Sequence, residues 1–490
     1  MELQWKNLLS TKRERQSESA YATSKRQDSK YVARNEFEAD YDRIVGSSSV
    51  RRLQDKAQVF PLQENDYTRT RLTHSIEVSA MARSLGKAVG RQLEERSIFD
   101  ADKTERFAAL LQTAGLIHDL GNPPFGHYGE SVIRDWFKRY FDGISILKKT
   151  ENVMSEQEKN DFLYFDGNVQ NVRIVTKLQT LNDCYGANFT YATIASILKY
   201  PWASDKRPEK KDGSGKKGKF GYFKSEEDII EEIQKETGLV ENVRHPATYL
   251  LEAADDIIYS CDDIEDGVKK GYINWEEQYG RLKQSINRNA DSAEKYKKLF
   301  ERIENKVPDE NMDPAEKKIA GVRNFRNIIQ AHLFQCAVDR FAKSYDLIIK
   351  GEYEEEDLLY EEEPLMKELF RITKEDCFSC HEVLALELVG DRVLRTLLDI
   401  FVKTLTEHDG KELCDVKTYA GKVFKLISPN FVYIALNEER NTDLKGSKEE
   451  KLDQLSIYDK LHLAVDFISG MTDSYAVNLY EELTGIKLPR

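Results

Sequence analysis

The chain has 490 residues, and its 73 Lys and Arg are outnumbered by 86 Asp and Glu, which gives a formal net charge of −13 at pH 7. This acidic balance argues against a protein built mainly to coat nucleic acid, although it leaves room for a local basic groove. The length allows a large hydrophobic core and, taken alone, suggests two or three domains.

The N-terminal segment MELQWKNLLSTKRERQ carries charges where a signal peptide needs an unbroken apolar run. No stretch approaches the ~20 apolar residues of a membrane span. Six scattered cysteines are too few for a disulfide framework in so long a chain. We therefore expect a cytoplasmic protein with no membrane contact and with reduced cysteines.

Helical signals dominate the chain. Apolar residues recur at spacings of three and four, and Glu, Lys, Leu and Ala are abundant. The pattern predicts an all-α fold with at most a small hairpin. Residues 1–45 are polar and charged, and we expect them to form an arm that either faces solvent or makes an oligomer contact.

Two predicted helices each carry a histidine on an apolar stripe. In RLTHSIEVSAMARSLGKAV (71–89) the stripe consists of Arg71, His74, Val78, Met81, Leu85 and Ala88. In the next helix it consists of Phe107, Leu111, Ala114 and His118. Both histidines should therefore face the core, where a single histidine is more often an ordinary core residue than a ligand.

Asp119 follows His118 at the expected end of the second helix, where Gly121, Pro123 and Pro124 prevent continuation. A carboxylate beside a buried histidine is costly unless it is paired or coordinates a metal. The doublet His118-Asp119 therefore favours a cation site.

The segment FGHYGESVIRDWF (125–137) follows directly and places His127 and Glu130 three residues apart. The two share a face if a helix begins here. A carboxylate in this position can hold an imidazole in the right tautomer for proton transfer. The alternative is an ordinary surface contact.

Residues 204–224, SDKRPEKKDGSGKKGKFGYFK, are rich in Lys, Gly and Pro. They predict a loop or short hairpin, an insertion over about 203–225 that cannot bury a core. Such a charge run is usually solvated. Its position directly after LKYPW (198–202) leaves open that it helps to gather phosphates.

The segment HPATYLLEAADDIIYSCDDIEDGV (245–268) predicts a helix that Pro246 opens. Its packed stripe consists of Leu250, Ala254, Ile257, Cys261, Ile264 and Val268. Asp255 and Tyr259 lie along the border of this stripe, one turn apart, and Asp262 and Asp263 lie about a turn further on. Acidic residues on a helix flank are usually solvated.

Combined with the two inward histidines, these carboxylates complete a set of two histidines and two aspartates. Such a set suits Mn²⁺, Fe²⁺, Ni²⁺, Mg²⁺ or Zn²⁺. The absence of a thiolate argues against a closed structural zinc site, so open positions for water and a phosphate are expected.

The remainder, 276–490, also predicts helices, with a soft boundary near 305–318. The acidic run GEYEEEDLLYEEEP (351–364) is expected to be a solvated surface. Cys377-Phe-Ser-Cys380-His381 matches the haem c attachment pattern, but that chemistry needs export. We expect ordinary helix residues there.

The chain resembles the HD-domain deoxynucleoside triphosphate triphosphohydrolases, and within them the bacterial dGTPase-like group. The matching stretches are RRLQDKAQVFPL (51–62), RTRLTHSIEV (69–78), AGLIHDLGNPPFGHYGE (114–130), FDGNVQNVRI (165–174), LKYPW (198–202), LEAADDIIYSCDDIEDGV (251–268) and FISGMTDSYA (467–476). The resemblance implies an HD-domain catalytic core over 46–275. It also implies a helical region over 276–490 that packs on the core and completes the substrate site.

The resemblance further implies that His74, His118, Asp119 and Asp255 hold the metal. Asp255 is preferred to its neighbour Asp256 because the family's metal aspartate is followed by a Tyr four residues on and an Asp eight residues on. Here these are Tyr259 and Asp263.

By the same resemblance His127 is the catalytic histidine near the α-phosphate, and Glu130 orients it. Arg71, Lys199 and Tyr200 are expected at the phosphates. Tyr259 is expected under the deoxyribose, with Gln58 and Asp263 at the sugar 3′-OH.

The implied reaction splits a dNTP, dGTP foremost, into deoxynucleoside and intact triphosphate by attack of water or hydroxide at the α-phosphorus. Mn²⁺ or Mg²⁺ is the expected ion, with Fe²⁺, Ni²⁺ and Zn²⁺ as alternatives. Family members commonly form ring-like or stacked oligomers, so a homohexamer is expected. Control by single-stranded DNA or by a second nucleotide is a family property that this sequence neither supports nor excludes.

Two other functions are considered. Another HD-superfamily phosphohydrolase, acting on a guanosine tetraphosphate or a cyclic nucleotide, would share the metal ligands but not the extended GNPPFGHYGE and EAADDIIYSCDD context. A non-catalytic nucleotide- or DNA-binding regulator would not need the His127 and Glu130 pair. The extended motif context and the His127 and Glu130 pair both favour the triphosphohydrolase.

Overall fold

A computed structural model describes residues 2–15, 34–60, 68–147, 154–179, 183–208, 218–240, 242–354 and 357–487. The described chain is helical, as predicted, and its β-structure consists of two isolated bridges, Ala57 with Thr70 and Ala203 with Tyr222. The all-α prediction is confirmed. None of the helices in these ranges combines the length and the apolar character that crossing a membrane requires.

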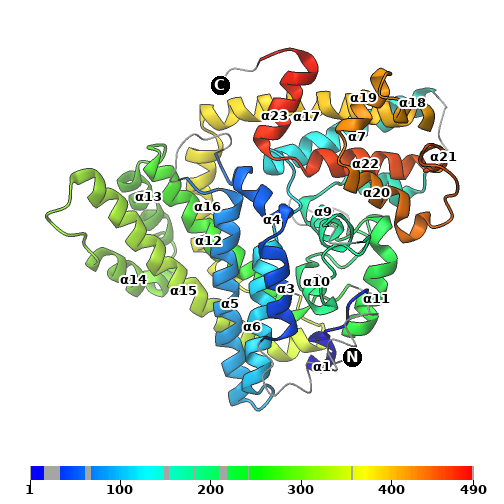
Figure 1. Ribbon diagram of the computed structural model, residues 1–490. Coiled ribbons are helices and arrows are strands. Elements are labelled where there is room, and N and C mark those ends of the chain that lie inside the picture. Colours follow the sequence, from blue (N-terminus) through cyan, green and yellow to red (C-terminus); the bar gives the residue numbers. More distant parts are fainter. Residues whose placement is uncertain are drawn as a thin grey trace.

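The first half of the chain contains α1 (Trp5–Leu8), α3 (Glu36–Val45), α4 (Ser48–Arg52), η1 (Leu53–Asp55), α5 (Arg71–Glu95), α6 (Ala101–Ile117), α7 (Gly126–Leu147), α8 (Glu156–Leu163), α9 (Gly167–Arg173), the π-helical η2 (Ile174–Leu178), α10 (Tyr191–Ile197), η3 (Lys224–Glu226), α11 (Glu227–Thr237) and α12 (Pro246–Lys269). Helices α5 and α6 lie side by side at the centre, and α12 packs across both (Figure 1). The site described below lies where these three helices meet.

Helices α5 and α6 approach closely because small residues face each other. A Cβ on Gly115 of α6 would come within 2.7 Å of Ser79 Cα on α5, so a larger residue would push the helices apart. The predicted stripes do face inward, with His74 2% exposed and His118 4% exposed. The close packing therefore brings both histidines to one buried place.

The prediction of a polar arm over 1–45 needs correction. Leu3, Trp5 and Leu8 are buried in the core, and Trp5 Nε1 donates a hydrogen bond of 2.8 Å to Tyr345 Oη. Helix α3 packs on α6 and buries Phe37. A few apolar residues in a charged segment suffice to dock it, and the average polarity of the segment concealed them. Residues 16–33 of the predicted arm lie outside the described residues.

The lysine-rich insertion is only partly a solvated loop. Residues 209–217 lie outside the described residues, but Phe220, Tyr222 and Phe223 are buried. The expectation that this segment buries no core is therefore wrong for its C-terminal end. Gly221 permits this packing, because a side chain there would collide with the backbone of Tyr200.

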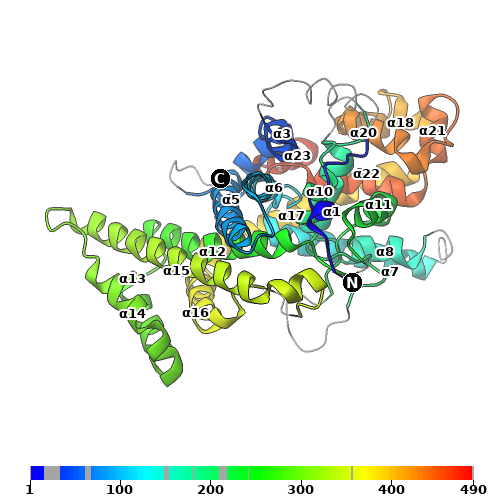
Figure 2. The ribbon, with the colours of Figure 1, turned by 90° about the horizontal axis from the view of Figure 1, so that it is seen from below.

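The second half contains α13 (Trp275–Asn287), α14 (Ala290–Asn305), α15 (Pro314–Lys350), η4 (Tyr360–Glu362), α16 (Glu363–Ile372), the π-helical η5 (Thr373–Phe378), α17 (His381–Glu407), α18 (Gly410–Cys414), α19 (Tyr419–Leu426), α20 (Pro429–Asn437), η6 (Glu439–Asn441), α21 (Lys448–Gln454), α22 (Ile457–Ser469) and α23 (Asp473–Thr484). Helix α15 packs along α12, while α13 and α14 project to one side in both views (Figures 1 and 2). Helix α17 packs between α7 and α22. The C-terminal half thus packs on α12 through α15 and on α7 through α17.

Two sequence features of this half can now be placed. In the acidic run 351–364, Leu358, Leu359 and Glu362 are buried, so the expectation of a uniformly solvated surface is wrong. Cys377 is buried in η5, and Cys380 caps the N-terminus of α17. Cys377 and His381 are helix residues, and Cys380 is the N-cap residue between the two helices.

Candidate metal centre and active site

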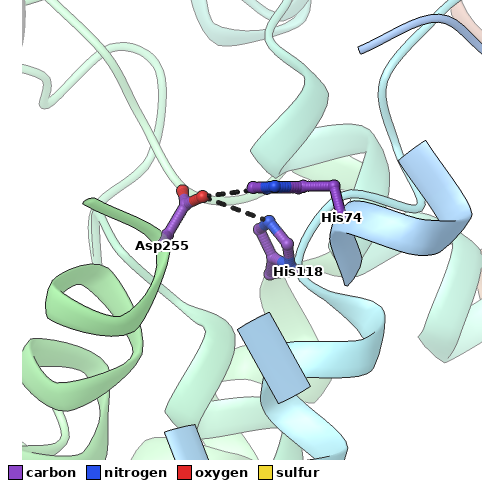
Figure 3. Close-up of side chains that lie close together, drawn as sticks. All are labelled: His74, His118 and Asp255. Atoms are coloured by element: carbon purple, nitrogen blue, oxygen red, sulfur yellow. Dashed lines mark hydrogen bonds and ion pairs between the residues drawn. The ribbon is translucent and has the colours of Figure 1, made fainter. Parts of the chain in front are cut away.

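Three side chains from the three central helices converge on one point. His74 lies on α5, His118 is the C-cap of α6, and Asp255 lies on α12. Asp255 Oδ1 is 3.1 Å from His74 Nε2 and 3.6 Å from His118 Nε2 (Figure 3). One ligand atom from each residue lies within 4.8 Å of the other two, which is close enough to share a metal ion.

The hydrogen bonding of His118 prepares it to bind a cation. Its Nδ1 is 2.7 Å from the Gly115 carbonyl oxygen, which accepts only from a protonated nitrogen and so leaves the lone pair on Nε2 in the neutral ring. That Nε2 is buried and has no hydrogen-bond partner among the described residues. A buried acceptor directed at a carboxylate and a second imidazole is explained by a cation between them. The donor set therefore fits a divalent metal.

Of the two adjacent aspartates on α12, Asp255 is the one that faces the histidines. Its second oxygen, Oδ2, is 3.7 Å from Lys199 Nζ. Burial lowers the pKa of Lys199, but the charges of Asp255, Glu252 and Asp119 together outweigh this effect and raise the pKa, so the ammonium is retained. Asp256 does not belong to the cluster.

Asp119 lies beside this cluster. Its Oδ1 is 3.6 Å from His118 Nε2 and accepts a hydrogen bond from Asn122 Nδ2 at 2.7 Å. Its Oδ2 accepts a 2.6 Å hydrogen bond from Arg71 Nη1. Asp119 is thus not one of the three residues whose ligand atoms group together; one of its oxygens lies near His118 while the other holds a buried guanidinium.

His127 and Glu130 do share a face at the start of α7. His127 Nδ1 is 3.3 Å from Glu130 Oε2, and Glu130 Oε1 accepts a hydrogen bond of 2.9 Å from the backbone N–H of Gly167. Glu130 is 4% exposed, whereas the His127 side chain is 78% exposed. The hydrogen bond to Glu130 and its negative charge raise the pKa of His127. The pair consists of a fixed carboxylate and an accessible imidazole, as a proton donor requires.

The remaining predicted site residues are Tyr200, Tyr259, Asp263 and Gln58. Tyr200 is buried, with the Lys219 ammonium 5.8 Å from the centre of its ring. Tyr259 and Asp263 follow Asp255 on α12, and burial raises the pKa of Asp263 to about 8. Gln58 is half-buried, and its Oε1 has no hydrogen-bond partner within the described part of the chain.

Three residues that sequence reasoning did not single out support this arrangement. Asn122 positions Asp119, as described above. Asp473 accepts hydrogen bonds of 3.0 Å from the backbone N–H groups of both Ala57 and Phe125. Lys56 is buried and donates to the carbonyl oxygens of Asn122 and Ser469. All three lie in sequence stretches that resemble the family (51–62, 114–130 and 467–476). Only the fold shows that these stretches are in contact.

Comparisons with known proteins identify the family of the chain. The family model for the HD domain matches residues 71–166. A deoxyguanosinetriphosphate triphosphohydrolase-like protein of Listeria monocytogenes is 36% identical over 99% of this chain and 100% of its own length, and one of Synechocystis is 32% identical over the same shares. A deoxyguanosinetriphosphate triphosphohydrolase of Serratia proteamaculans is 31% identical over 93% of this chain and 95% of its own. The chain therefore belongs to the deoxyguanosinetriphosphate triphosphohydrolase-like family of HD-domain proteins.

Proposed function

We propose that the protein hydrolyses deoxynucleoside triphosphates, dGTP foremost, to the deoxynucleoside and inorganic triphosphate in a metal-dependent reaction. The observation that carries this proposal is the cluster of buried His74 and His118 with half-buried Asp255, in which one imidazole nitrogen has no hydrogen-bond partner among the described residues. The names of the relatives support the substrate class. In the proposal Asp119 joins the cluster as the fourth ligand.

Two cations at the edge of the cluster suit a triphosphate. Arg71 pairs with Asp119, and Lys199 lies near Asp255, so each basic side chain is held in place before substrate arrives. A triphosphate carries several negative charges, and a guanidinium with an ammonium can neutralise part of them. Tyr200 is proposed to contact the same phosphates.

The metal would supply positive charge against the phosphate and lower the pKa of a coordinated water; Mn²⁺ or Mg²⁺ is our choice of ion. The protonated His127 is proposed to donate its Nε2 proton to the leaving 5′-oxygen, while Glu130 keeps the Nδ1 proton engaged. The leaving oxygen then departs as a hydroxyl group rather than as an alkoxide.

Contacts to the sugar are proposed for Tyr259, Gln58 and Asp263. The raised pKa of Asp263 leaves its carboxyl largely protonated at neutral pH, so it can donate a hydrogen bond as well as accept one. The unpartnered Gln58 Oε1 is an acceptor for the same 3′-OH. A ribose carries a 2′-OH in addition, which would lie next to the 3′-OH in this region.

The products identify the reaction. With Mn²⁺ or Mg²⁺, chromatography of each dNTP reaction should show deoxynucleoside and triphosphate in equal amounts, with dGTP turned over fastest. Pyrophosphate with dNMP, or stepwise loss of single phosphates, would contradict attack at the α-phosphorus. Hydrolysis of a guanosine tetraphosphate or a cyclic nucleotide alone would support another phosphohydrolase activity.

Gly126→Ala is expected to lower kcat/KM by roughly tenfold to a hundredfold through Arg71. Gly126 has φ +58°, and a Cβ there would come within 2.6 Å of Arg71 Nη2. The backbone conformation costs an L-residue about 1–2 kcal/mol, and the guanidinium must move. Steady-state kinetics and a denaturant midpoint separate the two effects.

Gly143→Ala on the same helix is the matched control, because nothing lies within 4 Å of its Cβ position and helical alanine is favourable. Equal kinetic losses in both variants would show that Arg71 is not the cause. Homohexamer formation and control by single-stranded DNA or a second nucleotide stay predictions of the family resemblance. A cytoplasmic location stays a prediction of the sequence composition.

A further inference from the structure

A second group of metal-ligating side chains lies outside the candidate active site. Among the described residues, His332, Cys336 and Glu362 offer a nitrogen, a sulfur and an oxygen atom within 4.8 Å of one another. His332 Nε2 is 3.1 Å from Glu362 Oε2 and 3.7 Å from Cys336 Sγ. Ligand atoms around one tetrahedral zinc lie about 3.5 Å apart, given bond lengths of ~2.0–2.3 Å. The observed separations match that spacing.

Local structure holds the donors in this arrangement. His332 and Cys336 are four residues apart on α15, so they share one face of the helix. The ring of Tyr296 on α14 packs edgewise on the His332 ring, with centroids 6.0 Å apart. Glu362 ends η4 and is 4% exposed. The three donors come from two segments that are separate in sequence.

The ion pair with Lys295 occupies one oxygen of Glu362, so the other oxygen can bind a cation. Its Oε1 pairs with Lys295 Nζ at 2.7 Å, while Oε2 lies 3.1 Å from His332 Nε2. A cation at Oε2 would thus meet a carboxylate whose other oxygen is held by an outer partner, an arrangement common around bound metals. The simpler alternative is that His332 donates a hydrogen bond to Glu362 and no metal binds.

We propose that His332, Cys336 and Glu362 bind a Zn²⁺ ion, with water as the fourth ligand, as a second metal site that connects α15 to η4. Binding releases the Cys336 thiol proton to solvent, and the sulfur becomes a thiolate ligand. A mixed nitrogen, sulfur and oxygen donor set suits zinc better than Mg²⁺ or Ca²⁺, which prefer oxygen alone. The inference does not depend on the proposed function, because it uses none of the active-site residues.

Cobalt distinguishes this site from the active-site cluster. Co²⁺ added to the metal-free full-length protein should produce thiolate-to-cobalt charge-transfer absorption in the near ultraviolet. The cluster of His74, His118 and Asp255 contains no sulfur and cannot contribute to that band. The band should therefore persist in Asp255→Asn.

Cys336→Ser should abolish the band and reduce bound zinc by about one equivalent per chain. Cys184→Ser, at another half-buried free cysteine, is the matched control and should keep both. His332→Gln should weaken zinc binding even if Cys336→Ser folds poorly, and far-ultraviolet circular dichroism checks folding of each variant. Absence of the band from the wild-type protein, or its survival in Cys336→Ser, would overturn the assignment.

Discussion

Asp255→Asn is expected to empty the active-site metal position and to lower turnover of the nucleotide substrate on the order of a thousandfold or more. Asp255 Oδ1 lies within 3.6 Å of both imidazole Nε2 atoms, and Asp255 is the carboxylate of the compact cluster of His74, His118 and Asp255. An amide keeps the shape but removes the negative charge that neutralises a divalent ion. The measurements are metal content after gel filtration and kcat with added Mn²⁺.

Asp256→Asn is the matched control because it makes the same chemical change one residue along α12. Successive residues on a helix are rotated by about 100°, so only one of two adjacent aspartates can face the histidines. Asp256→Asn should keep its metal and remain within about tenfold of wild-type turnover, since a helix border contact contributes little. If instead Asp256→Asn loses the metal and Asp255→Asn retains it, the ligand assignment is wrong.

The helices that carry the site could be predicted from periodicity alone. The stripes of α5 and α6 showed that His74 and His118 face the core, and Pro246 marked the start of α12. Burial of these helices on one another follows from the same pattern, because an apolar stripe must be covered. The fold class was accessible for this reason.

The choice between Asp255 and Asp256 needed more than the pattern. Both aspartates lie near the border of the α12 stripe, and a rotation of a few tens of degrees decides which one faces the histidines. The family resemblance selected Asp255, and the packing of α12 against α5 places that residue beside His74. The local sequence contains no equivalent information.

Contacts between residues far apart in the chain could not be predicted from the sequence, for a different reason. Asp473 holds the backbone of Ala57 and Phe125, and the partners are hundreds of residues apart in the chain. In a charged segment, the average polarity hides the few apolar residues that pack against the core. Trp5 and Phe223 are buried residues of this kind. Such contacts depend on tertiary packing, which local composition does not encode.

His127→Ala should reduce kcat by ~10²–10⁴-fold while leaving the metal content unchanged. The imidazole is exposed, and its Nδ1 is hydrogen-bonded to Glu130 rather than to a member of the cluster of His74, His118 and Asp255. Its removal therefore takes away a proton donor without disturbing the ligands. Loss of the metal from His127→Ala would instead place this histidine among the ligands.

The pH dependence of kcat/KM tests the same role. A donor must be protonated, so activity should fall as pH rises through the pKa of His127, and its hydrogen bond to Glu130 places that fall above the ordinary histidine value. Glu130→Gln removes the charge but retains an oxygen for the Gly167 N–H, so the pKa of His127 should drop and the alkaline limb should move to lower pH. If Glu130→Gln lowers the rate but leaves the alkaline limb at the same pH, the group that titrates in this limb is not His127. Glu130 would then act only by holding the backbone at Gly167 in place.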